Sequence, residues 1–198
     1  MGIFDFFKTK DGLQTTYYEN GKKKNEEYWK DGKLDGLATE WFESGQMKYE
    51  GYWKDGKLDG LFNSWYSNGQ MIVEKTYKYG KEDGLWTQWY ENGQKEEEST
   101  YKDGKKNGLT TWWFESGQMN CEGYYKDGKL ELMTSWYENG QKEFEETWKD
   151  GEKNGLSTYW YENGQKKFEE TWKDGEVVEL IGKWNEDGSV RTEPFDWE

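Results

Sequence analysis

The stretch Tyr49–Leu61, YEGYWKDGKLDGL, and its continuation FNSWYSNGQM contain two turn signals among residues that otherwise favour strands. Asp55-Gly56 and Asn68-Gly69 are typical of tight hairpin turns, because glycine adopts positive φ freely and Asp or Asn tolerates it. The Tyr, Trp, Phe and Thr residues around them favour β-strands. The stretch therefore predicts one unit of strand, turn, strand and turn.

This unit recurs along almost the whole chain. The glycines of the first turn follow one another at 24 residues, with one step of 23: Gly21, Gly45, Gly69, Gly93, Gly117, Gly140, Gly164 and Gly188. The glycines of the second turn keep the same rhythm: Gly32, Gly56, Gly80, Gly104, Gly128, Gly151 and Gly175. The short step falls at Lys129–Trp136, KLELMTSW, which lacks a third glycine found at Gly36, Gly60, Gly84, Gly108 and Gly155. A fixed period in this range indicates stacked supersecondary units.

We therefore predict an all-β fold, an elongated antiparallel β-meander of about eight 24-residue hairpin repeats in one twisted, curved sheet. Residues 12–178 hold seven repeats, and residues 179–198 hold a degenerate eighth repeat and a C-terminal cap. Residues 1–11, with the apolar side chains of Ile3, Phe4, Phe6 and Phe7, are expected to form an N-terminal cap that shields the open end of the array.

The composition suits a thin repeat array. Hydrophobic residues make up 32% of the chain and charged residues 34%, which alone would favour disorder. The 14 Trp and 15 Tyr residues supply the apolar area that the aliphatic residues lack. The net charge of −14 opposes binding to nucleic acid or anionic lipid, and favours a basic partner or solubility alone.

No residue pattern typical of an enzyme is found. The chain has no His, which removes imidazole acid–base chemistry and imidazole metal ligands, and Cys121 is its only cysteine. The segments Asp31–Gly36 and Asp55–Gly60 resemble the start of a calcium loop. The twelfth position of such a loop is a Glu that binds the ion, but here it is Phe42 or Tyr66. We predict a protein that is not an enzyme and holds no cofactor or metal. The single cysteine and the lack of a secretory signal or a membrane-length apolar stretch predict a cytoplasmic location.

Counting outward from Ser44-Gly45 as a two-residue loop assigns the strand positions to two faces. The first face carries one Leu, one large aromatic residue and one Glu per repeat, as Leu37, Trp41 and Glu50 show. Their strict recurrence predicts that this face is the packed side, with a bulge at the third glycine able to shift the register beyond Leu37. We expect each Glu to accept a hydrogen bond from a Trp indole or backbone amide, or to pair with a turn lysine. Eight identical copies favour this structural role over catalysis.

The second face is more variable and carries twelve aromatic side chains, which are the candidate partner-binding residues: Phe42, Trp53, Tyr66, Tyr77, Tyr90, Tyr101, Phe114, Tyr125, Tyr137, Trp148, Tyr161 and Trp172. The residues that follow the first turns are assigned to the same face: Met47, Met71, Lys95, Met119, Lys142 and Lys166. An aromatic stripe edged with charge binds peptides, sugars or proteins. The alternative is that these rings only stack between neighbouring strands.

The segment Tyr49–Gly60 resembles the MORN (membrane occupation and recognition nexus) motif, and Trp65–Gln70 resembles its bacterial variant form. The resemblance covers about residues 12–190 and departs from the pattern at Gly51, which recurs only as Gly123. It implies a repeat scaffold, and the bacterial variant form is associated with antitoxin and immunity proteins.

Three functions stay open at this stage. The leading one is a non-catalytic, cytoplasmic protein-binding scaffold, with an antitoxin or immunity protein that sequesters a basic protein as its specific form. The alternative is a glycan- or choline-binding module that uses the aromatic repeats. A weaker alternative is docking to phospholipid membranes through the turn lysines, which the net charge opposes. Homo-oligomer formation also stays open.

Overall fold

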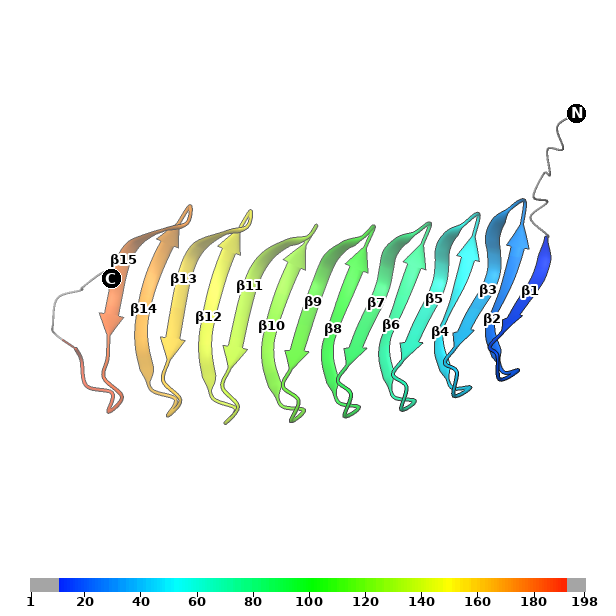
Figure 1. The fold of residues 1–198 in the computed structure, drawn as a ribbon. Coiled ribbons are helices and arrows are strands. Elements are labelled where there is room, and N and C mark those ends of the chain that lie inside the picture. Colours follow the sequence, from blue (N-terminus) through cyan, green and yellow to red (C-terminus); the bar gives the residue numbers. More distant parts are fainter. Residues whose placement is uncertain (1–10, 192–198) are drawn as a thin grey trace, which may run out of the picture. The chain divides into compact units, whose positions relative to one another are not determined.

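The computed structural model describes residues 11–191, so the apolar N-terminal segment and the tail with Phe195 and Trp197 lie outside the described residues. The described residues form fifteen strands: β1 Gly12–Tyr17, β2 Lys23–Lys30, β3 Lys33–Trp41, β4 Met47–Lys54, β5 Lys57–Trp65, β6 Met71–Lys78, β7 Lys81–Trp89, β8 Lys95–Lys102, β9 Lys105–Trp113, β10 Met119–Lys126, β11 Lys129–Trp136, β12 Lys142–Lys149, β13 Glu152–Trp160, β14 Lys166–Lys173 and β15 Glu176–Lys183. They belong to one antiparallel sheet in strict sequence order (Figure 1). The predicted all-β meander of hairpin repeats is confirmed.

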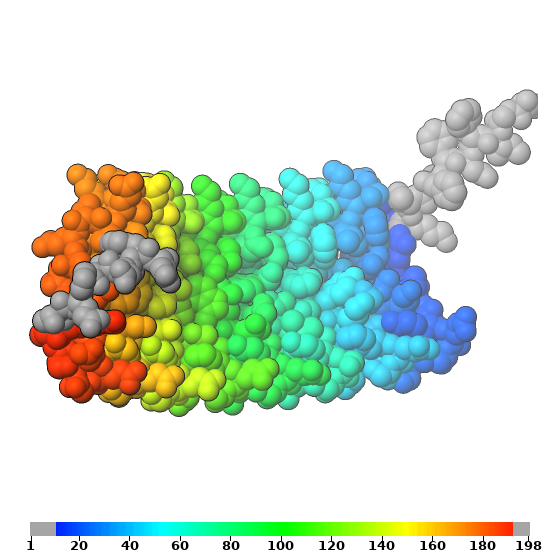
Figure 2. Space-filling view, turned by 60° about the vertical axis from the view of Figure 1, so that its left-hand side comes forward, coloured from blue at the N-terminus to red at the C-terminus, as the bar shows by residue number. Residues whose placement is uncertain are grey.

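By its contacts the chain divides into two units. The N-terminal unit comprises residues up to Gln94 together with Tyr101–Gly104, and the C-terminal unit comprises Lys95–Thr100 and the residues from Lys105 onward. Within each unit, successive repeats lie side by side, so that Figure 2 shows bands of colour in sequence order. Each repeat therefore packs on the repeats before and after it, as expected for a repeat array.

The second turn of each repeat is a two-residue hairpin turn, as predicted. Lys54 pairs with Lys57, and both Asp55 (φ 50°) and Gly56 (φ 79°) have positive φ. This is the geometry of a type I′ turn, for which Asp-Gly is a preferred dipeptide. The Gly56 N–H donates to the Leu34 carbonyl of the preceding repeat at 2.8 Å, so neighbouring turns are hydrogen-bonded to each other.

The first turn differs from the prediction. The Phe42 N–H donates to the Gln46 carbonyl and the Gly45 N–H donates to the Phe42 carbonyl, both at 2.8 Å, with Gly45 at φ 95°. The loop therefore has three residues and ends on a left-handed glycine. The predicted two-residue loop was wrong because Gly in a left-handed conformation is common to both loop types. Trp41 consequently pairs with Met47, while Glu40 pairs with Tyr49 beyond a bulge.

The third glycine creates the expected bulge. Gly51 pairs with Phe62 but Trp53 pairs with Leu58, so β5 contains two more residues than β4 at this point. Gly60 lies in this bulge at φ 133°, where a Cβ atom would approach the Tyr52 Cβ to 3.1 Å.

The repeat that lacks the third glycine makes a smaller bulge. There Tyr124 pairs with Leu132 and Tyr125 pairs with Leu130, which leaves one extra residue instead of two. The missing glycine is therefore absorbed within the bulge, and the strand that follows keeps its register.

The packed side is the second face, and the prediction for the first face was wrong. The leucines of the first face are mostly exposed, at 39–50%: Leu13, Leu61, Leu85, Leu109, Leu132, Leu156 and Leu180. Small second-face residues such as Ala38, Ser99 and Ser157 are buried, and they leave room for the larger rings beside them. These rings contact one another, as Tyr159 and Phe168 do with centroids 4.2 Å apart. On the first face, burial is confined to the central Thr and Asn column opposite the Glu residues.

Candidate binding surfaces

The first face presents three columns that run from repeat to repeat. Near the first turns, Trp41 pairs with Met47; in the middle, Thr39 pairs with Glu50; near the second turns, Leu37 pairs with Tyr52. Exposure rises toward the second turns, where the leucines and Tyr28, Tyr52 and Tyr124 are exposed. The face therefore combines a row of rings, a row of carboxylates and a row of exposed apolar side chains.

In four repeats a lysine connects the rings to the carboxylates. This lysine follows the first turn and pairs with the Glu three residues later: Lys23–Glu26, Lys95–Glu98, Lys142–Glu145 and Lys166–Glu169. The same ammonium lies 5.6–5.7 Å from the ring centroid of the next repeat's tryptophan: Lys23–Trp41, Lys95–Trp113, Lys142–Trp160 and Lys166–Trp184. We call this arrangement the Lys–Glu–Trp cluster. The lysine hydrogen bond is the main cause that lowers the pKa of Glu169.

The cluster corrects one prediction and refines another. The residue after the first turn was assigned to the second face, yet its ammonium meets Glu and Trp of the first face. The bulge after the three-residue loop, at Lys48 in the second repeat, explains the difference. The expectation that the Glu column pairs with lysine is confirmed in four repeats, but the lysine follows the first turn.

In three repeats methionine replaces this lysine, at Met47, Met71 and Met119. Glu50 accepts a hydrogen bond from the Asn63 side-chain amide at 3.3 Å. Across residues 11–191, no ion pair forms at Glu50, Glu74 or Glu122. All three carboxylates are half-buried and reach the surface of the first face.

The second face holds lysines on aromatic rings. Lys153 donates to the Glu146 carboxylate at 2.6 Å and to the Tyr159 hydroxyl at 2.9 Å. Its ammonium lies 4.9 Å from the Trp172 ring centroid and 5.8 Å from that of Trp148. Tyr159 also donates to Glu146. Burial is the main cause that raises the pKa of the Tyr159 hydroxyl, and this hydrogen bond is the second. These contacts form a closed cluster within the C-terminal unit.

A related cluster surrounds Lys106. Its ammonium donates to Glu97 at 2.6 Å and lies 4.6 Å from the Trp112 ring centroid and 5.4 Å from that of Tyr125. Glu97 also accepts the Ser99 hydroxyl at 2.7 Å. Rings of the second face that are arranged to hold a cation are therefore already occupied by the chain's own lysines.

The twelve candidate aromatic residues do not form one stripe. All are half-buried, six of them at the first turns and six beside the second turns, at opposite ends of the strands. Those at the first turns connect neighbouring repeats, because the Tyr137 hydroxyl donates to the Trp160 carbonyl at 2.9 Å and Tyr161 donates to the Trp184 carbonyl at 3.0 Å. Their role in partner binding stays a prediction.

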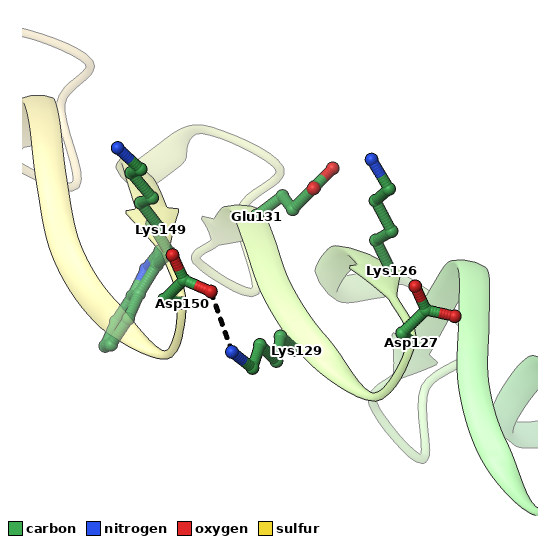
Figure 3. A pocket seen from close by; sticks show the side chains of 7 residues that line it. Lys126, Asp127, Lys129, Glu131, Lys149 and Asp150 are labelled. Carbon is green, nitrogen blue, oxygen red and sulfur yellow. Dashed lines mark hydrogen bonds and ion pairs between the residues drawn. The ribbon is translucent and has the colours of Figure 1, made fainter.

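A groove of about 400 Å³ opens where the third glycine is missing (Figure 3). Its lining is a mixture of cations, acids and one ring: Lys126, Asp127, Lys129, Glu131, Trp148, Lys149 and Asp150. Lys129 pairs with Asp150 at 2.7 Å, which lowers the pKa of the Asp150 carboxyl. The other lining lysines and Glu131 point to one side in Figure 3. The sequence showed the single 23-residue step between repeats but did not predict this groove.

The groove follows from lost contacts between turns. The Gly128 N–H donates to the Lys106 carbonyl at 2.8 Å, as in the regular repeats. No hydrogen bond of this kind forms at Gly151 within the described chain. The groove carries charges of both signs, and Lys129 and Asp150 neutralise each other across it.

The titratable groups of residues 11–191 include no cluster suited to a metal ion, and their one thiol is held in its neutral form. Among residues 11–191, no group of three or more Cys, Asp or Glu side chains is placed to hold a metal ion. Cys121 is buried. Burial, and to a smaller extent the charge of the nearby Glu122, raises the pKa of its thiol to about 11, which disfavours the reactive thiolate. No helix with the length and apolar character of a membrane span occurs in this part of the chain.

Comparison with known proteins identifies the repeat. A search of curated proteins gives no match. The family model described as MORN repeat variant matches seven segments: residues 10–33, 34–55, 58–79, 82–103, 106–131, 132–150 and 153–174. These segments cover most of the chain and coincide with the hairpins of the sheet. The chain therefore belongs to the MORN repeat variant family.

Proposed function

We propose that this protein is a non-catalytic scaffold that binds another protein through its first face. The observation that carries the proposal is the column of leucines, which recurs in every repeat and is exposed at 39–50% in seven of them. Exposed apolar side chains in a continuous row mark interaction surfaces. MORN repeats are commonly binding modules, which supports the same conclusion.

The charge of the chain favours a basic partner. The net charge is −14, and the leucine column runs beside the Glu column. A basic protein would gain attraction and a faster approach to this face, whereas phosphate groups of nucleic acids or anionic lipids would be repelled. The specific form of the proposal is an antitoxin or immunity protein of the cytoplasm, which sequesters a basic toxin.

The test uses the purified full chain as bait. Leu61→Gln with Leu85→Gln removes two exposed apolar side chains, and Tyr79→Asp is the matched control, because Tyr79 is 66% exposed at a turn where other repeats carry Asp. We expect proteins that bind the wild type and the control but not the double variant, and binding should weaken as salt is raised. Equal recovery with all three baits, or no protein recovered at all, would refute the proposal.

The antitoxin form has its own test. Expression of the recovered partner alone should arrest growth, and co-expression of the wild-type chain but not of the double leucine variant should restore it. A partner that is harmless when expressed alone would remove this form and leave the scaffold in place.

Two alternatives have less support. On the second face, a choline-type cation would have to displace Lys106 or Lys153 from the rings that they occupy. On the first face, a single small cation would gain one exposed ring contact and no apolar contacts, so we expect tryptophan fluorescence to change little during titration with choline or soluble glycans. The lysines of the second turns form an exposed row, but an Asp follows most of them, as at Lys54 and Lys102. We expect no flotation with anionic liposomes at physiological salt.

A further inference from the structure

The Glu column of the first face is not uniform, and its variation shows where a partner would bind. Where lysine follows the first turn, its ammonium contacts both a carboxylate and a tryptophan ring, as Lys142 does with Glu145 and Trp160. Where methionine follows the turn, Glu50 and Glu74 lack this ammonium. Methionine is one heavy atom shorter than lysine and carries no charge. These repeats therefore keep the anion and the ring but supply no cation.

Two such sites lie next to each other in the N-terminal unit. Trp65 is the first-face tryptophan of the repeat after Glu50, and Trp89 that of the repeat after Glu74. These are the positions that carry the Lys–Glu–Trp cluster elsewhere. The exposed Leu61 lies in the strand between the two carboxylates. We call Glu50, Trp65, Glu74 and Trp89, together with Leu61 and Leu85, the cation-accepting patch.

We propose that the cation-accepting patch binds a basic amphipathic helix of the partner protein, whose Lys or Arg side chains take the places that the chain's own lysines occupy in other repeats. This deepens the proposed function, on which it rests. Each partner cation would meet a carboxylate and a ring face, a combination that the chain already uses four times. The leucines beside the carboxylates would receive the apolar side chains of the same helix.

The spacing of the repeats and the presence of two columns to fill favour an α-helix. Neighbouring strands lie about 4.8 Å apart, so equivalent residues of successive repeats are roughly 9.6 Å apart. Seven residues of an α-helix rise about 10.5 Å, so one heptad matches one repeat. An extended strand places residues of one face about 6.7 or 13.4 Å apart and fits poorly. A polyproline helix, with three residues per about 9.3 Å, matches the distance closely, but it presents one residue per turn on one face and so fills one column instead of both.

The probe is a synthetic helical peptide of three heptads that carries one Leu and one Arg per heptad on the same face. Calorimetric titration of the full chain should give one bound peptide, and a scrambled peptide of equal composition should bind at least about tenfold more weakly. A proline-rich peptide with Arg at every third residue is the second probe. Preferred binding of the scrambled or proline-rich peptide would overturn the proposal.

Matched variants locate the site. Glu50→Gln with Glu74→Gln should weaken binding of the helical peptide by about tenfold or more, because two charge pairs are lost. Glu145→Gln with Glu169→Gln removes the same charge from the lysine-paired repeats and should change binding less than about threefold. Equal losses in the two variants would show that only the net charge of the chain attracts the peptide.

Exchanging the residues after the first turn tests the proposal in both directions. Met47→Lys with Met71→Lys supplies the lysines found in other repeats and should abolish binding while the fold is kept. Lys142→Met with Lys166→Met should create a second site, so the stoichiometry should rise from one peptide to two. A stoichiometry that stays at one after this exchange, with Met47→Lys and Met71→Lys also without effect, would overturn the proposal.

The two proposals fail separately. If the partner recovered with the wild type is lost with the leucine variant but unaffected by Glu50→Gln and Glu74→Gln, the scaffold stands and the cation-accepting patch falls. If neither pair of substitutions affects the partner, the proposed docking face itself is refuted.

Discussion

The neighbouring residues Glu145 and Glu146 should respond very differently to the same substitution. The Glu146 side chain is 7% exposed and accepts Lys153, itself 22% exposed, at 2.6 Å. Removing one partner of a buried pair costs roughly 3–5 kcal/mol, because the other charge is left without compensation. The ring faces of Trp148 and Trp172 keep about 1 kcal/mol of attraction for the ammonium. We therefore expect Glu146→Gln to lower the free energy of unfolding by about 2–4 kcal/mol.

Glu145→Gln is the control. Glu145 and Lys142 are 45% and 44% exposed, and a pair of this kind contributes about 0–1 kcal/mol. Urea denaturation followed by tryptophan fluorescence gives the free energies, and amide hydrogen exchange should show the Glu146→Gln loss in β12–β14 of the C-terminal unit. Equal effects of the two substitutions, or a Glu146→Gln loss below about 0.5 kcal/mol, would refute the assignment of the second face as the packed side.

Three further predictions concern single groups. Trp172→Phe should cost about 1–3 kcal/mol more in urea denaturation than Trp53→Phe, because the Trp172 indole donates to a carboxylate, while the buried N–H of the Trp53 indole has no hydrogen-bond partner among residues 11–191; equal losses would contradict this. Native Cys121 should react with a disulfide reagent at pH 8 at least about tenfold more slowly than the urea-unfolded chain; equal rates would contradict the burial. Because burial raises the pKa of this thiol from 9.0 to about 11, the contribution of the neutral thiol to the free energy of unfolding should be lost as the pH rises from 9.0 toward 11. Inserting one glycine between residues 131 and 132 should restore the turn contact of Gly151 and raise stability by about 1 kcal/mol, whereas a loss would show that the groove is not a packing defect.

The turns were predictable to different degrees. The Asp55-Gly56 turn follows from its dipeptide, because two consecutive positive φ angles admit few other residues. Ser44-Gly45 was assigned the wrong loop length, because a left-handed glycine ends both two- and three-residue loops. That one-residue difference creates a bulge next to Met47, and the bulge decided which face the following side chain joins. The Lys–Glu–Trp cluster was missed for this reason.

The packed face was not predictable from recurrence alone. The leucines recur as strictly as a core would require, yet they are exposed because nothing among residues 11–191 covers the first face. The second face varies in sequence because its neighbours compensate for each other, with Gly51 beside Phe62 in one repeat and Glu146 beside Lys153 in another. Compensation between neighbouring repeats is a property of contacts, which a single sequence does not display.

The bulge beside the second turn gives the chain a place where a residue is gained or lost without turning the later side chains to the opposite face. In an ordinary strand, one deletion turns every later side chain to the opposite face. Here the chain lost one residue before Leu132, yet Leu132 is still exposed, and Thr134 is still buried like its counterparts in other repeats. A one-residue change in length at this bulge therefore stays local, and the strands that follow keep the same side chains on the same face.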